Sequence, residues 1–437
     1  MVHRELVSGR KRRLAAPNPT ERAQAGTIEV MGRTTEGELP PEGVYEARRD
    51  VVERIDELAS DLIAVSHAIH DHPELGYEEH FAHEQFSRLI TKAGLNVSEG
   101  AYGLDTAFEA RGGTTGPALA VLCEYDALPG IGHACGHNII GAAGVGAGLG
   151  AAVVAEKLGG QVRILGTPAE EGGGGKIRLI NEGAFEGVDA ALMVHPADAD
   201  LTMMSSLAIQ QVEVSYTGLA AHAAAAPEEG INALDGAVLG YLNVAALRQH
   251  IAPDERLHGV FTDGGQKANI VPERAAAFWM ARSPSVEKLE RLKIRLIQAL
   301  QAGADAAGCE FRHSWIEPIY EEILDNAALL ERYVANAATL GRQVLPPGEQ
   351  RLVASTDLGN VSKVVPAIHP MIKVAPAGTP IHTSEFAEYA ASPDGDRAVL
   401  EGAKAMALTI VDCWSDQRIL VEAQAEFKAR AVNSPDR

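Results

Sequence analysis

The fold of this chain is decided by residues 118–166, which read ALAVLCEYDALPGIGHACGHNIIGAAGVGAGLGAAVVAEKLGGQVRILG. Ala118–Leu122 and Val162–Gly166 are short apolar runs typical of buried strands. Between them, Ile139–Leu158 is rich in glycine and alanine, which predicts a closely packed helix. A strand, a helix and a strand in this order indicate neighbouring strands of a parallel sheet that is covered by helices.

The same alternation continues on both sides of this segment. Helical periodicity runs from about Glu53 to Gly94, and a helix over Gly175–Glu182 is followed by a strand over Ala190–Val194. More strands are predicted from Val344 onward, and one or more closing helices over Glu385–Val411. We therefore predict an α/β fold with a mainly parallel central sheet flanked by helices.

A different pattern interrupts this alternation in the middle of the chain. Its predicted elements are, in order, strand, helix, strand, strand, helix and strand: Gln211–Tyr216, Asn232–His250, Leu257–Phe261, Ala275–Met280, Ser285–Ala307 and Glu310–Trp315. This β-α-β-β-α-β order is that of a ferredoxin-like unit. With 437 residues the chain exceeds the usual size of a single core. We predict a poorly ordered extension over 1–42, an α/β domain over 43–208 that resumes over 323–437, and an inserted ferredoxin-like domain over 209–322.

Composition excludes several classes of partner. The formal net charge of −21 argues against binding to nucleic acid or to an anionic membrane surface. No apolar run reaches about 18 residues, so no membrane span is expected. The four cysteines are widely spaced and form no disulfide framework, which favours a reducing, cytoplasmic location.

Residues that bind metals recur at the ends of the apolar runs. An acidic pair, Glu124 and Asp126, follows the first strand, and a Cys-Gly-His step follows at 135–137. Glu170 and Glu171 come after the next strand, then His195, and much later His382. Because ligands gather beyond the carboxyl ends of parallel strands, these side chains are expected to meet at one edge of the sheet. Thiolate, imidazole and carboxylate groups together indicate a divalent metal ion.

Five short motifs give the chain a specific resemblance. They are His72-Pro-Glu-Leu-Gly76, Asp126-Ala-Leu-Pro129, Ala134-Cys-Gly-His137, Pro168-Ala-Glu-Glu171 and Ser355-Thr-Asp-Leu-Gly-Asn360. From about Leu58 to the C-terminus the chain resembles the metallo-aminoacylase/carboxypeptidase family of di-metal amidohydrolases. That family includes glutamate carboxypeptidases, auxin-conjugate hydrolases and p-aminobenzoyl-glutamate hydrolases, and the subgroup with a Cys-Gly-His step is the more similar one.

The resemblance implies the metal ligands. They would be Cys135, His137, Glu171, His195 and His382, which suit up to two divalent metals with positions left for substrate. Zinc or manganese would fit this mixture of donors, and cobalt or nickel would also be accommodated. Any one of these histidines, taken alone, is more typical of a hydrogen-bonded histidine in the protein interior.

Two carboxylates next to these ligands are expected to have other roles. If Glu171 binds metal, its neighbour Glu170 can take a proton from the attacking water and return it to the leaving amine. The alternative is that both are surface glutamates at the start of a helix. Asp126 is expected to orient a metal-binding histidine through a hydrogen bond. Gly172–Gly175 followed by Lys176 looks like a phosphate loop, but isoleucine stands where serine or threonine is required, so a nucleotide site is rejected.

The resemblance also implies residues that contact the substrate. His222, in the inserted domain, would hydrogen-bond the carbonyl oxygen as it becomes an oxyanion, acting within its own chain or across to a second copy. Asn269 and Arg282 would hold a substrate carboxylate, although a solvated strand end is the alternative for Arg282. Gly378 and Thr379 would shape the loop that carries the last ligand. The inserted domain would then be a lid that also forms a homodimer.

The reaction implied is hydrolysis of the C–N amide bond of an N-acyl or N-aroyl amino acid, such as an aminobenzoyl-glutamate type of conjugate, or of a small dipeptide. The small-molecule substrate is expected to carry a carboxylate. One alternative is hydrolytic deamination of an aromatic amine at the same metal site, which releases ammonia instead of an amino acid. A second alternative is a catalytically silent relative that binds metal or peptide, although the adjacent Glu170 and Glu171 argue against it.

Overall fold

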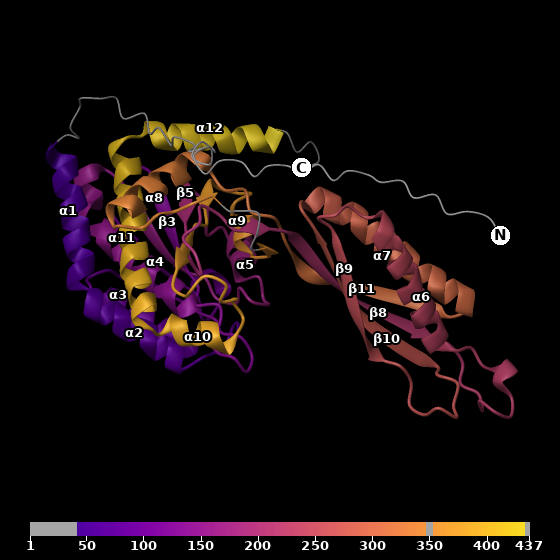
Figure 1. The fold of residues 1–437 in the computed structure, drawn as a ribbon. Coiled ribbons are helices and arrows are strands. Elements are labelled where there is room, and N and C mark those ends of the chain that lie inside the picture. Colours follow the sequence, from indigo (N-terminus) through magenta and orange to yellow (C-terminus); the bar gives the residue numbers. More distant parts are fainter. Residues whose placement is uncertain (1–41, 347–352, 433–437) are drawn as a thin grey trace, which may run out of the picture. The chain divides into compact units, whose positions relative to one another are not determined.

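The structure is a computed structural model that describes residues 42–346 and 353–432 (Figure 1). In chain order its helices are α1 (Glu42–Glu57), α2 (Ala59–Asp71), α3 (His80–Lys92), α4 (His137–Leu158), α5 (Gly175–Asn181), α6 (Ala233–Leu247), α7 (Val286–Ala307), α8 (Ala327–Thr339), α9 (Leu358–Val361), α10 (Ser384–Ala390), α11 (Pro393–Ser415) and α12 (Arg418–Val432). Its strands are β1 (Val97–Glu99), β2 (Phe108–Gly112), β3 (Ala118–Cys123), β4 (Gln161–Gly166), β5 (Ala190–Leu192), β6 (His195–Ala197), β7 (Ser205–Ser206), β8 (Ala208–Thr217), β9 (Arg256–Asp263), β10 (Arg274–Ser283), β11 (Glu310–Tyr320), β12 (Val353–Ala354), β13 (Ala367–Ile368) and β14 (Met371–Lys373).

The larger sheet has the strand order β1-β2-β4-β3-β5-β13. Its centre is parallel, since β3 pairs in parallel with β4 and β5, and β13 with β5. The predicted α/β fold with a mainly parallel sheet is confirmed. The sequence analysis missed the antiparallel edge formed by β1 and β2, because these short strands carry too few residues to show a period.

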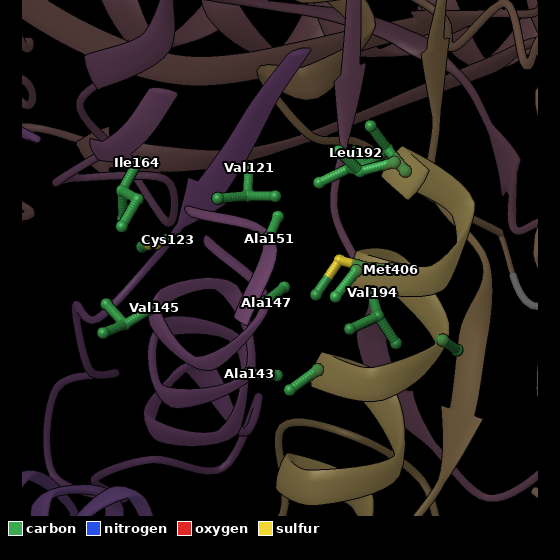
Figure 2. Packing of buried hydrophobic residues seen from close by; sticks show 14 of the residues in the cluster. Val121, Cys123, Ala143, Val145, Ala147, Ala151, Ile164, Leu192, Val194 and Met406 are labelled. Atoms are coloured by element: carbon green, nitrogen blue, oxygen red, sulfur yellow. The ribbon is translucent and has the colours of Figure 1, made fainter. Parts of the chain in front are cut away.

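Helix α4 crosses from β3 to β4 and packs against the sheet on one side and α11 on the other. Figure 2 shows Ala143, Ala147 and Ala151 of α4 on the side of the helix that faces Val194 and Met406. These alanines recur every four residues and therefore share one helix face. Their small side chains allow the close packing that the composition of 139–158 predicts.

Two glycines of α4 make the contact with the sheet closer still. A Cβ atom added at Gly144 would lie 2.7 Å from Cys123 Sγ, and one added at Gly148 would lie 2.3 Å from Ile164 Cγ1. Only glycine fits at these two positions, because either methyl group would overlap a strand side chain.

Helix α4 is also long and apolar enough to cross a membrane, judged by length and composition alone. However, 89 % of its most apolar window is buried inside the protein. This burial is that of a core helix, so it does not change the expectation that the chain has no membrane span.

The smaller sheet, formed by residues 208–320, has the strand order β11-β8-β10-β9 and is antiparallel throughout. Helices α6 and α7 cover one of its faces (Figure 1). Both helices begin at polar caps: the Asn232 side chain accepts hydrogen bonds from the first turn of α6, and Ser285 does the same for α7. The elements follow in the predicted β-α-β-β-α-β order, and the sheet has its own hydrophobic core. The predicted boundaries at 208/209 and 322/323 remain predictions.

Other details differ from the sequence analysis. The helical region from 53 to 94 is three helices, and α1 begins before it, at Glu42. The strands predicted from Val344 onward are short, two or three residues each within the described part. The closing helices include α12, which the sequence analysis did not predict. The predicted extension, 1–42, lies outside the described residues except for Glu42.

Candidate metal centre

The five predicted ligands come from different elements and meet at one edge of the larger sheet. Cys135 and His137 lie at the start of α4, Glu171 follows β4, and His195 begins β6. His382 lies in the loop before α10, where it adopts a left-handed φ of 63° and its N–H donates to Ala134 O at 2.8 Å.

These side chains form two overlapping groups of donor atoms. In each group the donor atoms all lie within 4.8 Å of one another: Cys135, His137 and His195 form one, and Cys135, Glu171 and His382 form the other. Cys135 Sγ lies 3.4 Å from His195 Nε2, and Glu171 Oε1 lies 3.4 Å from His382 Nε2. The structure therefore brings together all five predicted ligands, with Cys135 common to both groups.

The donor atoms are oriented as metal ligands require. His137 Nδ1 is hydrogen-bonded to Asp126 Oδ1 at 3.0 Å and His195 Nδ1 to Pro196 O at 2.8 Å, so both Nε2 atoms remain for the cluster. Within the described residues, His137 Nε2 and Glu171 Oε1 are buried without a hydrogen bond. Burial lowers the pKa of His195 to about 4, which keeps its imidazole in the neutral form that binds metal. These residues fit a divalent metal.

Asp126 lies where the sequence predicts it. Its Oδ1 is bonded to His137, and its Oδ2 accepts the N–H of Glu171 at 2.9 Å. Burial by itself would raise the pKa of Asp126, but the charge and hydrogen bond of His137 outweigh burial, and the pKa is lowered. The carboxylate therefore stays charged and fixes one histidine and the backbone of one glutamate.

Glu170 is buried beside the cluster, with its Oε2 atom 3.9 Å from His137 Nε2. Its backbone is held by two neighbours: the Tyr320 hydroxyl donates to Glu170 O at 2.7 Å, and Ala169 N–H donates to Glu79 at 2.8 Å. Burial raises the pKa of Glu170 well above its usual range, and the charges of Glu124 and Glu171 raise it further. A carboxylate with a raised pKa is suited to accept and return a proton near neutral pH.

The sequence analysis missed a buried ion network behind Glu170. The Lys176 ammonium lies 2.6 Å from Glu124 Oε1 and 2.7 Å from Asp357 Oδ1, and all three side chains are fully buried. Burial opposes the charge on Lys176, but Asp357 and Glu124 raise its pKa, so the ammonium stays charged. Glu124, Glu170 and Asp357 could also hold a cation, but the Lys176 ammonium already neutralises two of them. The one signal in the sequence was the lysine after the glycine run.

A cavity of about 410 Å³ adjoins the metal ligands. Glu171 and His382 line it together with Arg282 from β10. One guanidinium nitrogen of Arg282 donates to Ser355 Oγ at 3.2 Å, while Arg282 Nε is buried without a partner among the described residues. The structure therefore places Arg282, a predicted carboxylate-binding residue, in the same cavity as two predicted ligands.

The other predicted substrate residues lie outside this cavity. His222 and Asn269 are exposed on neighbouring loops of the inserted sheet, where His222 pairs with Ile270 in a β-bridge and Asn269 O accepts from Ala223. Gly378, with a φ of 94°, donates its N–H to Asp198, and Thr379 is buried in the loop before His382. Both therefore shape that loop without lining the cavity.

The dense group of histidines near the N-terminal helices contributes no metal ligand within the described residues. His67 pairs with Asp396, His70 and His72 bond to backbone carbonyls, and His83 bonds to Thr106 O. All four side chains are used in packing and hydrogen bonding.

Nitrogen, oxygen and sulfur donors at the carboxyl edge of a parallel sheet, with a buried glutamate beside them, define a metal-dependent hydrolase. The chain matches peptidase family M20/M25/M40 over residues 120–412 and belongs to that family. It is accordingly a hydrolase that acts on C–N amide bonds, and the resemblance noted in the sequence is confirmed.

Relatives extend over most of the chain. It is 40% identical over 403 residues to the Xaa-Arg dipeptidase of Mus musculus, covering 88% of this chain and 92% of the relative. It is 29% identical over 445 residues to a p-aminobenzoyl-glutamate hydrolase of Escherichia coli, covering 85% and 92%. The fold is similar to that of a Bacillus subtilis protein described as a dinuclear metal-binding peptidase, with a TM-score of 0.66, 18% identity and coverage of 82% and 99%. Together with the donor groups, these findings support a divalent metal.

Proposed function

We propose that this chain is a metal-dependent amidohydrolase that releases a free amino acid from small dipeptides, including dipeptides with C-terminal arginine, or from N-acyl and N-aroyl amino acids. The observation that carries the proposal is the cavity shared by Glu171, His382 and Arg282. A guanidinium binds a carboxylate through two parallel hydrogen bonds, so Arg282 would hold the substrate with its amide bond near the metal ligands. The dipeptidase and aminobenzoyl-glutamate hydrolase relatives support this substrate class.

The residues have separate roles in the proposed reaction. Cys135, His137, Glu171, His195 and His382 would hold one or two ions, zinc or manganese in preference to cobalt or nickel. When bound, such an ion polarises the amide carbonyl and acidifies water. Glu170 would take the proton from the attacking water and deliver it to the leaving nitrogen. Asp126 would keep His137 in the tautomer that leaves Nε2 for the metal.

The exposed position of His222 and Asn269 favours a homodimer in which a second copy supplies these residues. Helix α6 and the edge strand β9 carry exposed apolar side chains, including Leu242 at 56% and Val260 at 63% exposure. Apolar side chains gathered on one surface are typical of a protein interface. We therefore propose a homodimer formed through the inserted domain, which would also act as the lid.

All four cysteines are free. Free thiols favour a reducing compartment, so we propose a cytoplasmic location.

A panel assay tests the function. The purified chain is loaded with Mn²⁺, Zn²⁺ or Co²⁺, its metal content is measured by elemental analysis, and released amino acid and ammonia are quantified for dipeptides, N-acyl amino acids and free aryl amines. We expect one or two metals per chain and release of an amino acid. Glu170→Gln is expected to keep its metal and lose activity by about 10²–10⁴-fold, the usual contribution of a general base.

Two outcomes would contradict the proposal. Release of ammonia from an aryl amine, with no amino acid from any amide, would move the function to hydrolytic deamination. Metal binding without hydrolysis of any substrate in the panel would indicate a silent relative.

A further inference from the structure

The cavity next to the metal ligands contains a carboxylate that neither the metal centre nor the proposed chemistry uses. Glu317 follows the regular pairing of β11 with β8, where the register shifts between Ile316 and Tyr320. Irregular pairing of this kind re-aims side chains out of the regular alternation. In the described part of the chain Glu317 forms no ion pair, and its one hydrogen bond is from Gln210 Nε2 to its Oε1 atom at 3.0 Å.

Gln210 provides a second, independent indication of a ligand. Its side chain is 2 % exposed and lines the cavity. Its amide nitrogen donates to Glu317 and to Ile316 O, which fixes the orientation of the amide. Gln210 Oε1 is left buried, without a hydrogen-bond partner among the described residues. An unpaired buried acceptor costs about 1–3 kcal/mol, so this oxygen favours a ligand that brings a donor.

The charges in the cavity are arranged across one strand. Arg282 pairs with Ile209 of β8, and Ile316, the residue before Glu317, pairs with Gln211 of β8. The backbones that carry the guanidinium and the carboxylate are therefore two strand spacings apart, about 10 Å. Apolar side chains of Met280 and Ile316 line the space between them.

We propose that Glu317, supported by Gln210, is the residue that selects substrates whose released amino acid has a cationic side chain. This inference rests on the proposed function, in which Arg282 holds the substrate carboxylate. Once that carboxylate pairs with Arg282, Glu317 is the remaining negative charge that binds neither metal nor a cation of the protein. A guanidinium or ammonium pairs with it, the guanidinium also donates to Gln210 Oε1, and the alkyl stem packs on the apolar side chains.

The same cavity disfavours other side chains. A neutral side chain would leave the Glu317 carboxylate desolvated without a partner, and an acidic one would place a second negative charge beside it. Selectivity therefore comes from a cost imposed on the wrong substrate as well as from the new ion pair.

Hydrolysis of Ala-Arg, Ala-Leu and Ala-Glu by the metal-loaded chain tests the inference. We expect Ala-Arg to be preferred, and Glu317→Gln to lower kcat/KM for Ala-Arg by about 10- to 100-fold, the value of a hydrogen bond to a charged group. The same variant should leave Ala-Leu nearly unchanged. Glu317→Arg should shift the preference toward Ala-Glu. The matched control is Glu310→Gln, which removes a carboxylate from the same strand outside the cavity.

A binding measurement accompanies the kinetics. Free L-arginine is titrated into the Glu170→Gln variant and into the Glu170→Gln/Glu317→Gln double variant, with L-leucine as the comparison. Weaker arginine binding in the double variant, with leucine binding unchanged, supports the inference. Hydrolysis of dipeptides with no preference for Ala-Arg, or an unchanged preference in Glu317→Gln, would overturn it while the proposed function stands. Failure to hydrolyse any amide substrate would remove the proposed function and this inference with it.

Discussion

Cys135 belongs to both groups of donor atoms, which distinguishes it from the other four predicted ligands. A cysteine hydrolase would instead need a free thiolate beside a base. The thiol is buried, and the nearest donor in its own group, His195 Nε2, is oriented by a backbone carbonyl as a metal ligand would be. The residue is therefore expected to act as a ligand of both metals.

Replacement of this thiol provides the first prediction. Cys135→Ser is expected to lose bound zinc or manganese and activity together, because a serine hydroxyl is a poor substitute for a thiolate ligand. Elemental analysis and the amino-acid release assay measure the two effects. Cys309→Ser, at a buried cysteine of the inserted sheet, is the control and should keep its metal. Full metal content in an inactive Cys135→Ser would point to a nucleophile instead.

Glu79 provides a prediction about pH. Its pKa is raised to about 7, by burial first and by the charge of Asp126 second. An unfolded glutamate has a pKa of about 4.3, so the folded state binds the extra proton and loses stability as pH rises from about 4 through 7. Glu79→Gln removes this loss. We expect the variant to gain about 2–4 kcal/mol relative to the unchanged chain between pH 4 and pH 8, measured by urea unfolding at both values. An equal difference at the two pH values would show that Glu79 is ionised throughout.

At the scale of elements, the Lys176 ammonium joins three segments that are far apart in the chain. It projects from α5 and pairs with Glu124 after β3 and with Asp357 just before α9. The backbone N–H of Lys176 also donates to Asp357 at 2.9 Å. This network lies behind Glu170 and fixes the positions of the loops that follow two strands.

Removal of that cation is predicted to be costly. Lys176→Met should lower the free energy of unfolding by about 3–5 kcal/mol, because two buried carboxylates lose their partner. Adding Glu124→Gln and Asp357→Asn should recover part of this loss, since the uncompensated charges are then gone. Urea unfolding of the single and triple variants measures both effects. A Lys176→Met variant within about 1 kcal/mol of the unchanged chain would contradict the pairing.

At the scale of the whole molecule, the sequence could predict what periodicity and strand ends determine. The alternation around 118–166 predicted the parallel sheet, and the positions of Cys135 and Glu171 after strands predicted that their side chains meet. The Lys176 network could not be predicted, because no periodic pattern links a lysine on α5 to carboxylates after β3 and before α9. The position of Glu317 depends on a register shift in β11, and register is a property of the paired strands rather than of either sequence alone.

The proposed homodimer gives a prediction at this scale. Glu170→Gln and His222→Ala are each expected to be nearly inactive. When the two variants are mixed and allowed to exchange protomers, a hybrid pair has one site with an intact Glu170 and a His222 from the other copy. If His222 acts across the dimer, activity should return to about a quarter of the unchanged level, since half of random pairs are hybrids.

The controls for this mixing experiment are the two variants alone and a mixture kept under conditions without exchange. No recovery after demonstrated exchange would place His222 in the reaction of its own protomer. Leu242→Lys, on the exposed face of α6, should prevent pairing, measured by sedimentation, and reduce activity while the metal content stays unchanged.

Helix α4 opens with His137 and continues into the core, where Gly144 and Gly148 pack against strand side chains. Natural selection for metal affinity therefore also restricts drift in the interior of the protein. A substitution at Gly148 would be eliminated as an inactivating change, although it touches no donor atom. The strands β8, β10 and β11, whose side chains line the substrate cavity, carry no ligand and are free to diversify. New specificities within this lineage are expected to evolve there while α4 stays nearly constant.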